Sequence, residues 1–200
     1  MVDLTDRSLI TEYDIRAIAM GETLRIRDNA LVTPLAADLA RERRIQFERQ
    51  PSPAARRKIA IGADHGGYAM KEALKDVLSE LGVDYQDFGT KSAEPVDYPD
   101  FAYAVASAVS RGICDLGIMI DGAGIGSCMV ANKVPGVRAA MCYDEASARN
   151  SREHNGANVL TLGGKTMSLP KMKDVVGIWL STELTEERHR RRVEKINALL

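Results

Sequence analysis

The chain has 200 residues, 45% of them hydrophobic, and 27 Lys and Arg against 28 Asp and Glu give a formal net charge of -1. This balance lacks the basic excess typical of nucleic-acid-binding proteins, and no apolar run approaches the roughly 20 residues of a membrane span, so we expect neither partner. Three scattered cysteines without a CxxC pair favour a reducing compartment and no metal site. With no export signal visible in the first residues, we expect a cytoplasmic protein.

The composition changes near residue 57. Residues 50–57 form a stretch of Pro, Ala and Arg that is typical of a linker, and no lysine precedes Lys58. We therefore predict two parts, an extension with its linker over residues 1–57 and a larger domain over residues 58–200.

The extension has weak but recognisable helix signals. We expect a helix over residues 9–20, with Thr11 as N-cap, and a short strand at 24–27. A second helix is expected to begin near Thr33, because a threonine followed by proline is a common helix start. These elements predict a small, mostly helical extension with too little apolar surface to fold alone, so we expect it to dock on another surface.

The larger domain shows a regular alternation of strand and helix patterns. The expected strands are 58–63, 83–88, 116–120, 137–142 and 158–162, and the expected helices are 68–81, 101–111, 126–132, 144–153, 169–180 and 186–200. Short strands separated by helices predict an α/β fold with a parallel sheet covered on both faces. In such folds ligands bind at the carboxyl ends of the strands.

The most informative stretch is residues 118–127, where an apolar strand ends in Asp121 and glycines follow at alternate positions. A glycine-rich turn before a helix presents backbone N–H groups that suit an anion or oxyanion. Asp121 could take a proton from whatever those groups bind. The alternative is an ordinary tight turn in which Ser127 caps the helix.

Further polar motifs stand at other element ends, and each also has a structural explanation. Asp64 and His65 follow the first strand of the domain, where they could be a capping carboxylate and a surface histidine. His154 ends a helix, as C-cap residues do. Arg188 and Arg192 are four residues apart on a helix, which makes a fork for a phosphate or simply a solvated face.

Together these motifs resemble the ribose-5-phosphate isomerase type B family, which also includes galactose-6-phosphate isomerase subunits. The resemblance runs in order through residues 58–200. It implies a Rossmann-like three-layer α/β/α fold with a five-stranded parallel sheet, and a homodimer or dimer of dimers with shared active sites. It also implies no cofactor and no metal. The implied reaction interconverts an aldose phosphate and a ketose phosphate, by default ribose 5-phosphate and ribulose 5-phosphate, through an enediol(ate).

The resemblance also implies roles for single residues. Asp121 stands at the position of the catalytic base, His154 opens the sugar ring, and Asp64 orients sugar hydroxyls. The implied substrate-binding residues are His65, Tyr98, Gly122, Ala123, Gly124, Gly126, Ser127, Asn132 and Asn155. The implied phosphate-binding residues are Arg138, Arg188 and Arg192.

One departure from the family pattern leaves the function open. The common motif has a cysteine base followed by Gly-Thr-Gly, whereas here Asp121 replaces the cysteine and Ala123 the threonine. Either Asp121 is a carboxylate base, or the chain is a subunit that depends on a partner chain. Hexose 6-phosphates of the galactose or allose type are alternative substrates. A dinucleotide-binding module is a third possibility, although the glycine loop does not follow the domain's first strand.

Residues 31–45 resemble a segment of enzymes associated with bacterial microcompartments. This resemblance implies that residues 1–57 bind a microcompartment shell or cargo partner, which would place the protein inside that compartment. The alternative is that the segment packs on the catalytic domain or extends a dimer interface.

Overall fold

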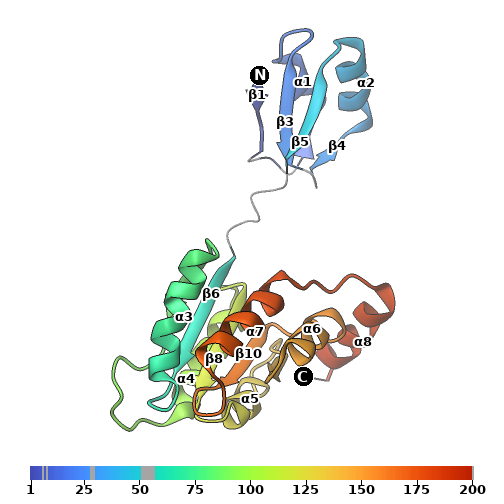
Figure 1. Cartoon of the computed structure of the whole chain (residues 1–200). Coiled ribbons are helices and arrows are strands. Elements are labelled where there is room, and N and C mark those ends of the chain that lie inside the picture. The colour runs from blue at the N-terminus through green and yellow to red at the C-terminus, as the bar shows by residue number, and fades with distance from the viewer. Residues whose placement is uncertain (6, 8, 28–29, 51–56, 200) are drawn as a thin grey trace. The chain divides into compact units, whose positions relative to one another are not determined.

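The computed structural model describes the chain except for residues 6, 8, 28–29, 51–56 and 200, and it divides into two compact units (Figure 1). Unit 1 spans Met1–Arg56 and unit 2 spans Arg57–Leu200. Of the predicted linker, residues 51–56 lie outside the described residues.

Unit 2 contains a five-stranded sheet whose neighbouring strands are all parallel. Its strands are β6 (Lys58–Ala63), β7 (Asp84–Asp87), β8 (Leu116–Asp121), β9 (Ala139–Met141) and β10 (Val159–Gly163), in the order β7-β6-β8-β10-β9. The predicted parallel sheet is confirmed, with β8 in the centre.

Helices cover both faces of this sheet (Figure 1). They are α3 (Tyr68–Glu80), α4 (Tyr98–Ser110), α5 (Ile125–Ala131), α6 (Glu145–Glu153), α7 (Leu169–Ser181) and α8 (Glu187–Asn197). One core cluster joins the sheet to α3, α6 and α7, and a second joins the other face to α4 and α5. The predicted three-layer α/β/α fold is therefore confirmed.

The strand sequences explain the two cores. Ile59 and Ile61 point to the face of α3 and α7, while Ala60, between them, points to α4, as the period of two along a strand requires. At Gly117 a side chain would stand 2.8 Å from Val105 of α4. The absence of a side chain therefore lets α4 lie directly against the middle of the sheet.

The direction of the strands gives unit 2 two functionally different edges. Each strand ends at what we call the carboxyl edge, and the helix after it returns the chain to the amino edge. Residues 64–67, 122–124 and 164–168 therefore lie at the carboxyl edge. Contacts at the amino edge include a hydrogen bond of 3.1 Å from Arg57 to the carbonyl oxygen of Leu180 at the end of α7.

Unit 1 is also an α/β structure. A three-stranded parallel sheet in the order β1-β3-β5 and a two-stranded parallel sheet of β2 and β4 accompany two helices. The elements are β1 (Val2–Asp3), β2 (Leu9–Ile10), α1 (Glu12–Arg16), β3 (Thr23–Arg27), β4 (Leu31–Val32), α2 (Pro34–Glu42) and β5 (Gln46–Gln50).

The expectation of a mostly helical extension with too little apolar surface is therefore wrong. Unit 1 has its own buried cluster, which includes Ile10, Ile15, Leu24 and Ile26. The predicted caps are present, with a capping box at Thr11 and a side-chain cap at Thr33. The strand predicted at 24–27 is present as β3, but the other four strands were not predicted, because they are only two to five residues long and pair with strands about 20 residues away.

Candidate active site

Asp121 ends β8 at the carboxyl edge and is almost fully buried. One carboxylate oxygen accepts hydrogen bonds from the N–H groups of Ala123, at 2.8 Å, and Gly124. The other accepts the N–H of Ser127, at 3.0 Å, and its hydroxyl. The carboxylate therefore lies at the N-terminus of α5, where free N–H groups and the helix dipole favour a negative charge.

This geometry revises two expectations about the loop. Ser127 is not the N-cap of α5, because Gly124 holds that position with a φ of 80° and Ser127 lies in the first turn. The N–H of Gly124, expected to hold an oxyanion, binds Asp121 of the same loop instead. Strand β10 also holds the loop, because the hydroxyl of its buried residue Thr161 donates to the carbonyl oxygen of Gly124 at 2.7 Å.

Tyr98, the first residue of α4, lies against the same loop. A side chain at Gly126 would stand 2.6–2.7 Å from atoms of the Tyr98 ring, including its hydroxyl oxygen. Gly126 thus admits the tyrosine ring, and the structure brings these two predicted residues together.

Asp64 and His65 follow β6 and face the glycine loop. Asp64 is buried, and one of its oxygens accepts the N–H of Gly67 at 3.0 Å. Its other oxygen is 4.0 Å from Nδ1 of His65. Gly66 closes the gap between the loops, because a side chain there would be 3.2 Å from the backbone nitrogen of Gly122.

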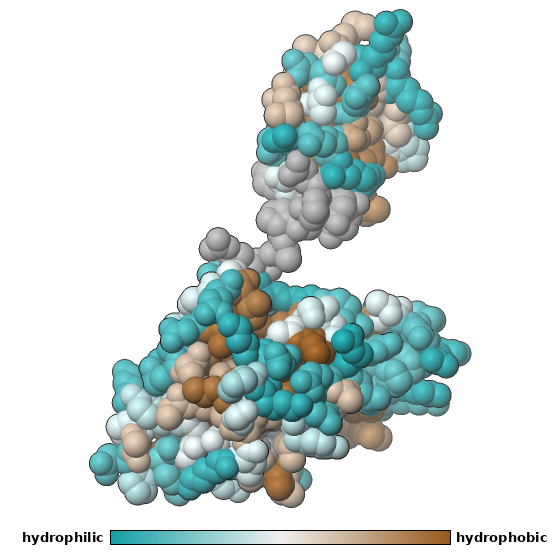
Figure 2. Space-filling model, in the orientation of Figure 1, coloured by the Kyte–Doolittle hydropathy of each residue, from teal (hydrophilic) through white to brown (hydrophobic). Residues whose placement is uncertain are grey.

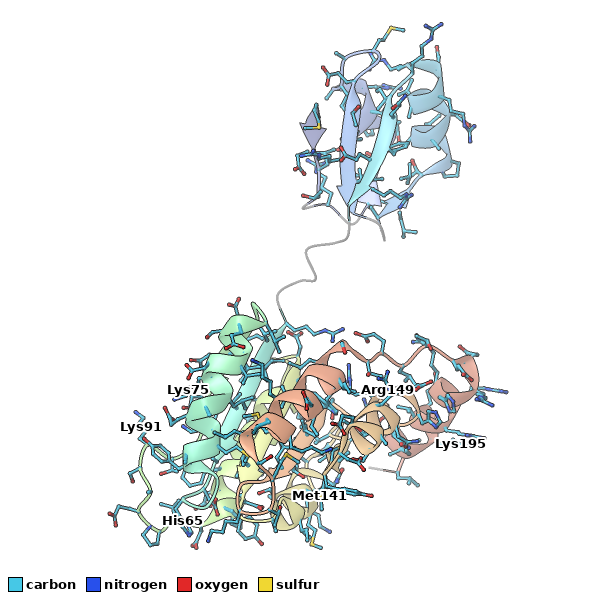
Figure 3. All side chains as sticks on the ribbon, in the orientation of Figure 1. His65, Lys75, Lys91, Met141, Arg149 and Lys195 are labelled. Atoms are coloured by element: carbon cyan, nitrogen blue, oxygen red, sulfur yellow. The ribbon has the colours of Figure 1, made fainter. Side chains whose placement is uncertain are left out.

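The ring of His65 is oriented by Val96. Its Nδ1 lies 3.2 Å from the carbonyl oxygen and 3.3 Å from the nitrogen of Val96, so it donates or accepts according to its tautomer. Both contacts use Nδ1, so Val96 does not engage Nε2. Figure 3 shows His65 at the same lower edge of unit 2 as Met141, the last residue of β9.

Lys165 completes the carboxyl edge, and the sequence analysis did not single it out. Its N–H donates to the carbonyl oxygen of Gly122 at 3.0 Å, and its side chain passes 3.7 Å from where a Cβ of Gly122 would stand. The signal was present in the sequence, since Lys165 directly follows two glycines at a strand end. A flexible cation therefore lies over the glycine loop.

A buried cation that the sequence analysis also missed supports this edge from beneath. The ammonium of Lys71 contacts the carboxylate of Asp87 at 2.5 Å and the carbonyl oxygen of Thr90 at 3.0 Å. Burial alone would raise the pKa of Asp87, but hydrogen bonds from Lys71 and Lys75 hold this pKa below its usual value. The cluster fixes the start of the segment that carries Val96 and leads to Tyr98.

The remaining candidates lie at the amino edge. His154 is the C-cap of α6, which runs back from the carboxyl edge, and β10 begins five residues later. Because β8 has six residues at about 3.3 Å each, roughly 20 Å of strand separates the two edges. His154 and Asn155 therefore cannot reach Asp121 of the same chain.

Helix α8 supplies the positive charge of this edge. Arg188, Arg191, Arg192 and Lys195 line one shallow pocket on its surface. Figure 3 shows Lys195 at the far end of unit 2 from His65. Arg188 and Arg192 thus line the same pocket, away from the glycine loop of their own chain, and their role in binding phosphate stays a prediction.

Two other predicted residues make structural contacts. The amide of Asn132 donates to the carbonyl oxygen of Ala139 at 3.0 Å and accepts its N–H at 2.9 Å, which clips α5 to β9. Arg138 donates to the carbonyl oxygen of Gly156 at 2.9–3.0 Å and to Asn197 of α8 at 2.8 Å. Arg138 therefore holds α8 in place.

The described part of the chain contains no cluster of three or more His, Cys, Asp or Glu residues able to hold a metal ion. None of its described helices is both long and apolar enough to cross a membrane.

Comparison with known proteins places this geometry in a family context. The Ribose/Galactose Isomerase family model matches residues 59–196. Ribose-5-phosphate isomerase B of Escherichia coli is 43% identical over 143 residues, which cover 72% of this chain and 96% of that protein. D-erythrulose-4-phosphate isomerase of Pectobacterium atrosepticum is 40% identical over 139 residues, 69% of this chain and 91% of that protein. The solved structure of Clostridium thermocellum ribose-5-phosphate isomerase B matches with a TM-score of 0.70 and 50% identity, covering 71% of this chain and 96% of that one.

Proposed function

The chain belongs to the ribose/galactose isomerase family, and from this premise we propose that it converts ribose 5-phosphate into ribulose 5-phosphate. Membership of this family assigns the chain the aldose–ketose isomerisation of a sugar phosphate. The observation that carries the assignment to a site is the buried carboxylate of Asp121 in a glycine loop, with Asp64 and His65 on the neighbouring loop.

The test is an isomerase assay of the purified chain against a panel of sugar phosphates. The panel contains ribose 5-phosphate, allose 6-phosphate, galactose 6-phosphate and erythrulose 4-phosphate. We expect the highest kcat/KM with ribose 5-phosphate. A higher value with a hexose phosphate would reassign the substrate, and no turnover with any of the four would contradict an autonomous isomerase.

We assign the enediol step to Asp121. Its carboxylate takes the proton from C2 and returns it to C1, while the hydroxyl proton moves from O2 to O1. Each of its two oxygens already accepts two hydrogen bonds. One of these four hydrogen bonds must therefore break before the carboxylate can accept a proton from the substrate. The hydroxyl of Ser127 is the donor that can leave, because it turns about a side-chain torsion, whereas the other three donors are backbone N–H groups.

A cyclic substrate must open before this step. We assign ring opening to His154, which gives a proton to the ring oxygen as the bond from C1 to that oxygen breaks, and to Asp64, which takes the proton of the anomeric hydroxyl. Histidine is the side chain most often used to give and take protons in enzymes, which suits this step.

Because the two edges lie about 20 Å apart, we propose that the site is completed by a second copy of the chain. The carboxyl edge of one copy supplies Asp121, Asp64 and His65, and the amino edge of the other supplies His154 and the arginines of α8. The same interface serves both copies when a twofold axis relates them. Lys165 adds a cation beside the glycine loop.

One observation favours a second candidate function. All four hydrogen bonds that the Asp121 carboxylate accepts come from its own loop and the first turn of α5, as expected of a group that fixes the loop. Asp121 could therefore be only the structural anchor of the loop, and the chain would then need a different partner chain that carries the base. The substitution of Asp121 described below separates these alternatives.

For unit 1 we propose an assembly or addressing role, through a microcompartment shell or cargo protein as the expected partner. In support, the family model begins only at residue 59, and all of the site candidates named above lie in unit 2. Unit 1 also has a hydrophobic cluster of its own, as expected of a module with a separate role.

A further inference from the structure

His189 is a buried ionisable residue that the proposed mechanism does not use. It lies on α8 between the two arginines of the phosphate fork, and only 2% of its surface is exposed. Neither of its ring nitrogens has a hydrogen-bond partner among the described residues. A buried polar group without a partner costs about 1–3 kcal/mol, so the polar atoms do not explain why a histidine stands here.

The shape of the ring does offer an explanation. The rings of His189 and His154 are stacked, with centroids 4.3 Å apart and planes inclined by 15°. His154 is the C-cap residue of α6, and its ring would otherwise be free to turn about two side-chain torsions. The stack holds this ring in one plane.

The surroundings of His189 favour the neutral form of its ring. Burial, together with His154 and Arg188, lowers the pKa of His189, so its ring is neutral at pH 7. The other charged groups nearby are Glu186, the N-cap of α8, whose oxygen lies 3.6 Å from Nε2 of His189, and Arg192 of α8. Arg138 reaches α8 from the amino edge through Asn197. A neutral aromatic face beneath His154 attracts the protonated form of that ring.

We propose that His189 is a positioning residue for the ring-opening step: its neutral ring is the platform on which His154 stacks, orienting it and favouring its proton-bearing form. This inference rests on the proposed function, because it assigns His154 to ring opening. It requires of position 189 a flat aromatic ring and no hydrogen bond. The variant His189→Phe should therefore preserve ring opening. The variant His189→Leu should impair it, because leucine has similar bulk but is not flat.

The experiment compares the variants His189→Phe and His189→Leu on two substrates. Ribose 5-phosphate forms a furanose ring and must be opened. Erythrose 4-phosphate cannot form that ring, because its C4 oxygen carries the phosphate. We expect His189→Leu to lower kcat/KM for ribose 5-phosphate by roughly 10- to 100-fold, within the usual contribution of a positioned acid, and to change it less than threefold for erythrose 4-phosphate. His189→Phe should stay within threefold of the wild type on both.

Two further measurements exclude a merely structural effect. The inhibition constant of inorganic phosphate should not change in either variant, because it reports the arginines of α8. The apparent pKa of the acid group in the pH profile of kcat/KM should fall in His189→Leu and stay unchanged in His189→Phe. Equal losses on both substrates, or failure of phenylalanine to rescue, would overturn the proposal.

Failure of the proposed function is recognised separately. If the wild type turns over neither substrate, ring opening is not its activity, and the titration of His154 followed by NMR decides on the stack alone. The pKa of His154 should then be lower in His189→Leu than in the wild type and in His189→Phe. The same value in all three proteins would refute the platform.

Discussion

The two edges of the sheet in unit 2 carry their functional groups in opposite ways. At the carboxyl edge the groups are short side chains held by backbone hydrogen bonds, as for Asp121 and Asp64. At the amino edge they are long cations on an exposed helix, where Arg188 pairs with Glu186 of its own helix. The proposed base therefore sits on a rigid loop, whereas the charge expected to meet a phosphate sits on side chains able to adjust.

The surface follows the same division. Figure 2 shows a hydrophilic surface around α8, at the right of unit 2, and brown apolar patches over the region of α3 and α7. Val77 and Ile178 line a shallow groove between α3 and α7. The arginines are thus exposed to a ligand or a second copy, whereas in the glycine loop Asp121 and Gly124 are buried and Ala123 is exposed.

The largest effect should come from removing the carboxylate of the carboxyl edge. Asp121→Asn should lower kcat by roughly 10²–10⁴, the usual contribution of a positioned acid or base. Asp121→Cys introduces another group able to act as a base and should retain measurable turnover. Steady-state kinetics of both variants provide the measurement.

Ser127→Ala is the matched control, because it removes the hydroxyl donor and leaves the backbone donors to Asp121 in place. It should preserve or raise kcat. If Asp121→Cys is as inactive as Asp121→Asn, and calorimetry shows both to be equally destabilised, Asp121 is an anchor of the loop and not the base.

The next largest effect should come from the amino edge. Arg192→Ala should raise KM for sugar phosphates by roughly 10- to 100-fold, because a guanidinium–phosphate contact contributes about 1.5–3 kcal/mol. Arg190→Ala, on the same helix but outside the pocket, is the control and should have little effect. An equal rise of KM in both variants would mean that the positive charge of the whole helix, and not the pair Arg188 and Arg192, binds the phosphate.

Mixing two impaired variants, assayed at a substrate concentration below the wild-type KM, tests directly whether the edges meet between copies. If Asp121→Asn and Arg192→Ala chains exchange at random, half of the dimers are mixed, and each mixed dimer has one intact site out of two. About one quarter of wild-type activity should then return. Recovery that stays at the level of the separate variants, with subunit exchange shown by mass spectrometry, would place both edges in independent sites.

A smaller effect concerns the support of the carboxyl edge. Lys71→Met should lower the free energy of unfolding by about 2–3 kcal/mol, because it leaves Asp87 without its buried partner. The pKa of Asp87 is lowered in the folded chain, so the pair contributes fully above the ordinary aspartate value of ~3.9 and loses its contribution as the pH falls below it. The difference from the wild type, measured in urea, should therefore shrink between pH 5 and pH 3.

The smallest effect on catalysis should follow from deletion of residues 1–56. Because unit 1 has its own core, kcat/KM should stay within a few-fold of the whole chain while oligomeric state or encapsulation changes. A truncated protein that is dimeric, folded and inactive would show instead that unit 1 completes the active site.

The sequence was sufficient for the sheet of unit 2 but not for unit 1. In unit 2 the three inner strands, β6, β8 and β10, are mostly apolar runs that end at or directly before a glycine or an acid, a pattern with few alternatives. In unit 1 the two-residue strands of Leu9–Ile10 and Leu31–Val32 are too short to show a period, and only their pairing with each other defines them.

The candidate site was predictable by residue type and position rather than by contact. Asp64, His65 and Tyr98 meet the glycine loop because parallel strands end at one edge, which the strand order implies. The four hydrogen bonds of Asp121 could not be foreseen, since they depend on the exact turn at Gly124. Nor could the stack on His189, because it depends on how α8 returns against the end of α6.

The close approach of Gly66 to Gly122 has a consequence for substrate choice. No side chain separates these two loops, so backbone alone forms the floor of the proposed site. In the proposed dimer the phosphate is held by α8 of the other copy. The distance between this helix and the two loops then determines how long a sugar chain fits. A shift of the subunit interface by one carbon–carbon bond would then be enough to exchange a pentose for a tetrose or a hexose, without any change in the residues that perform the chemistry.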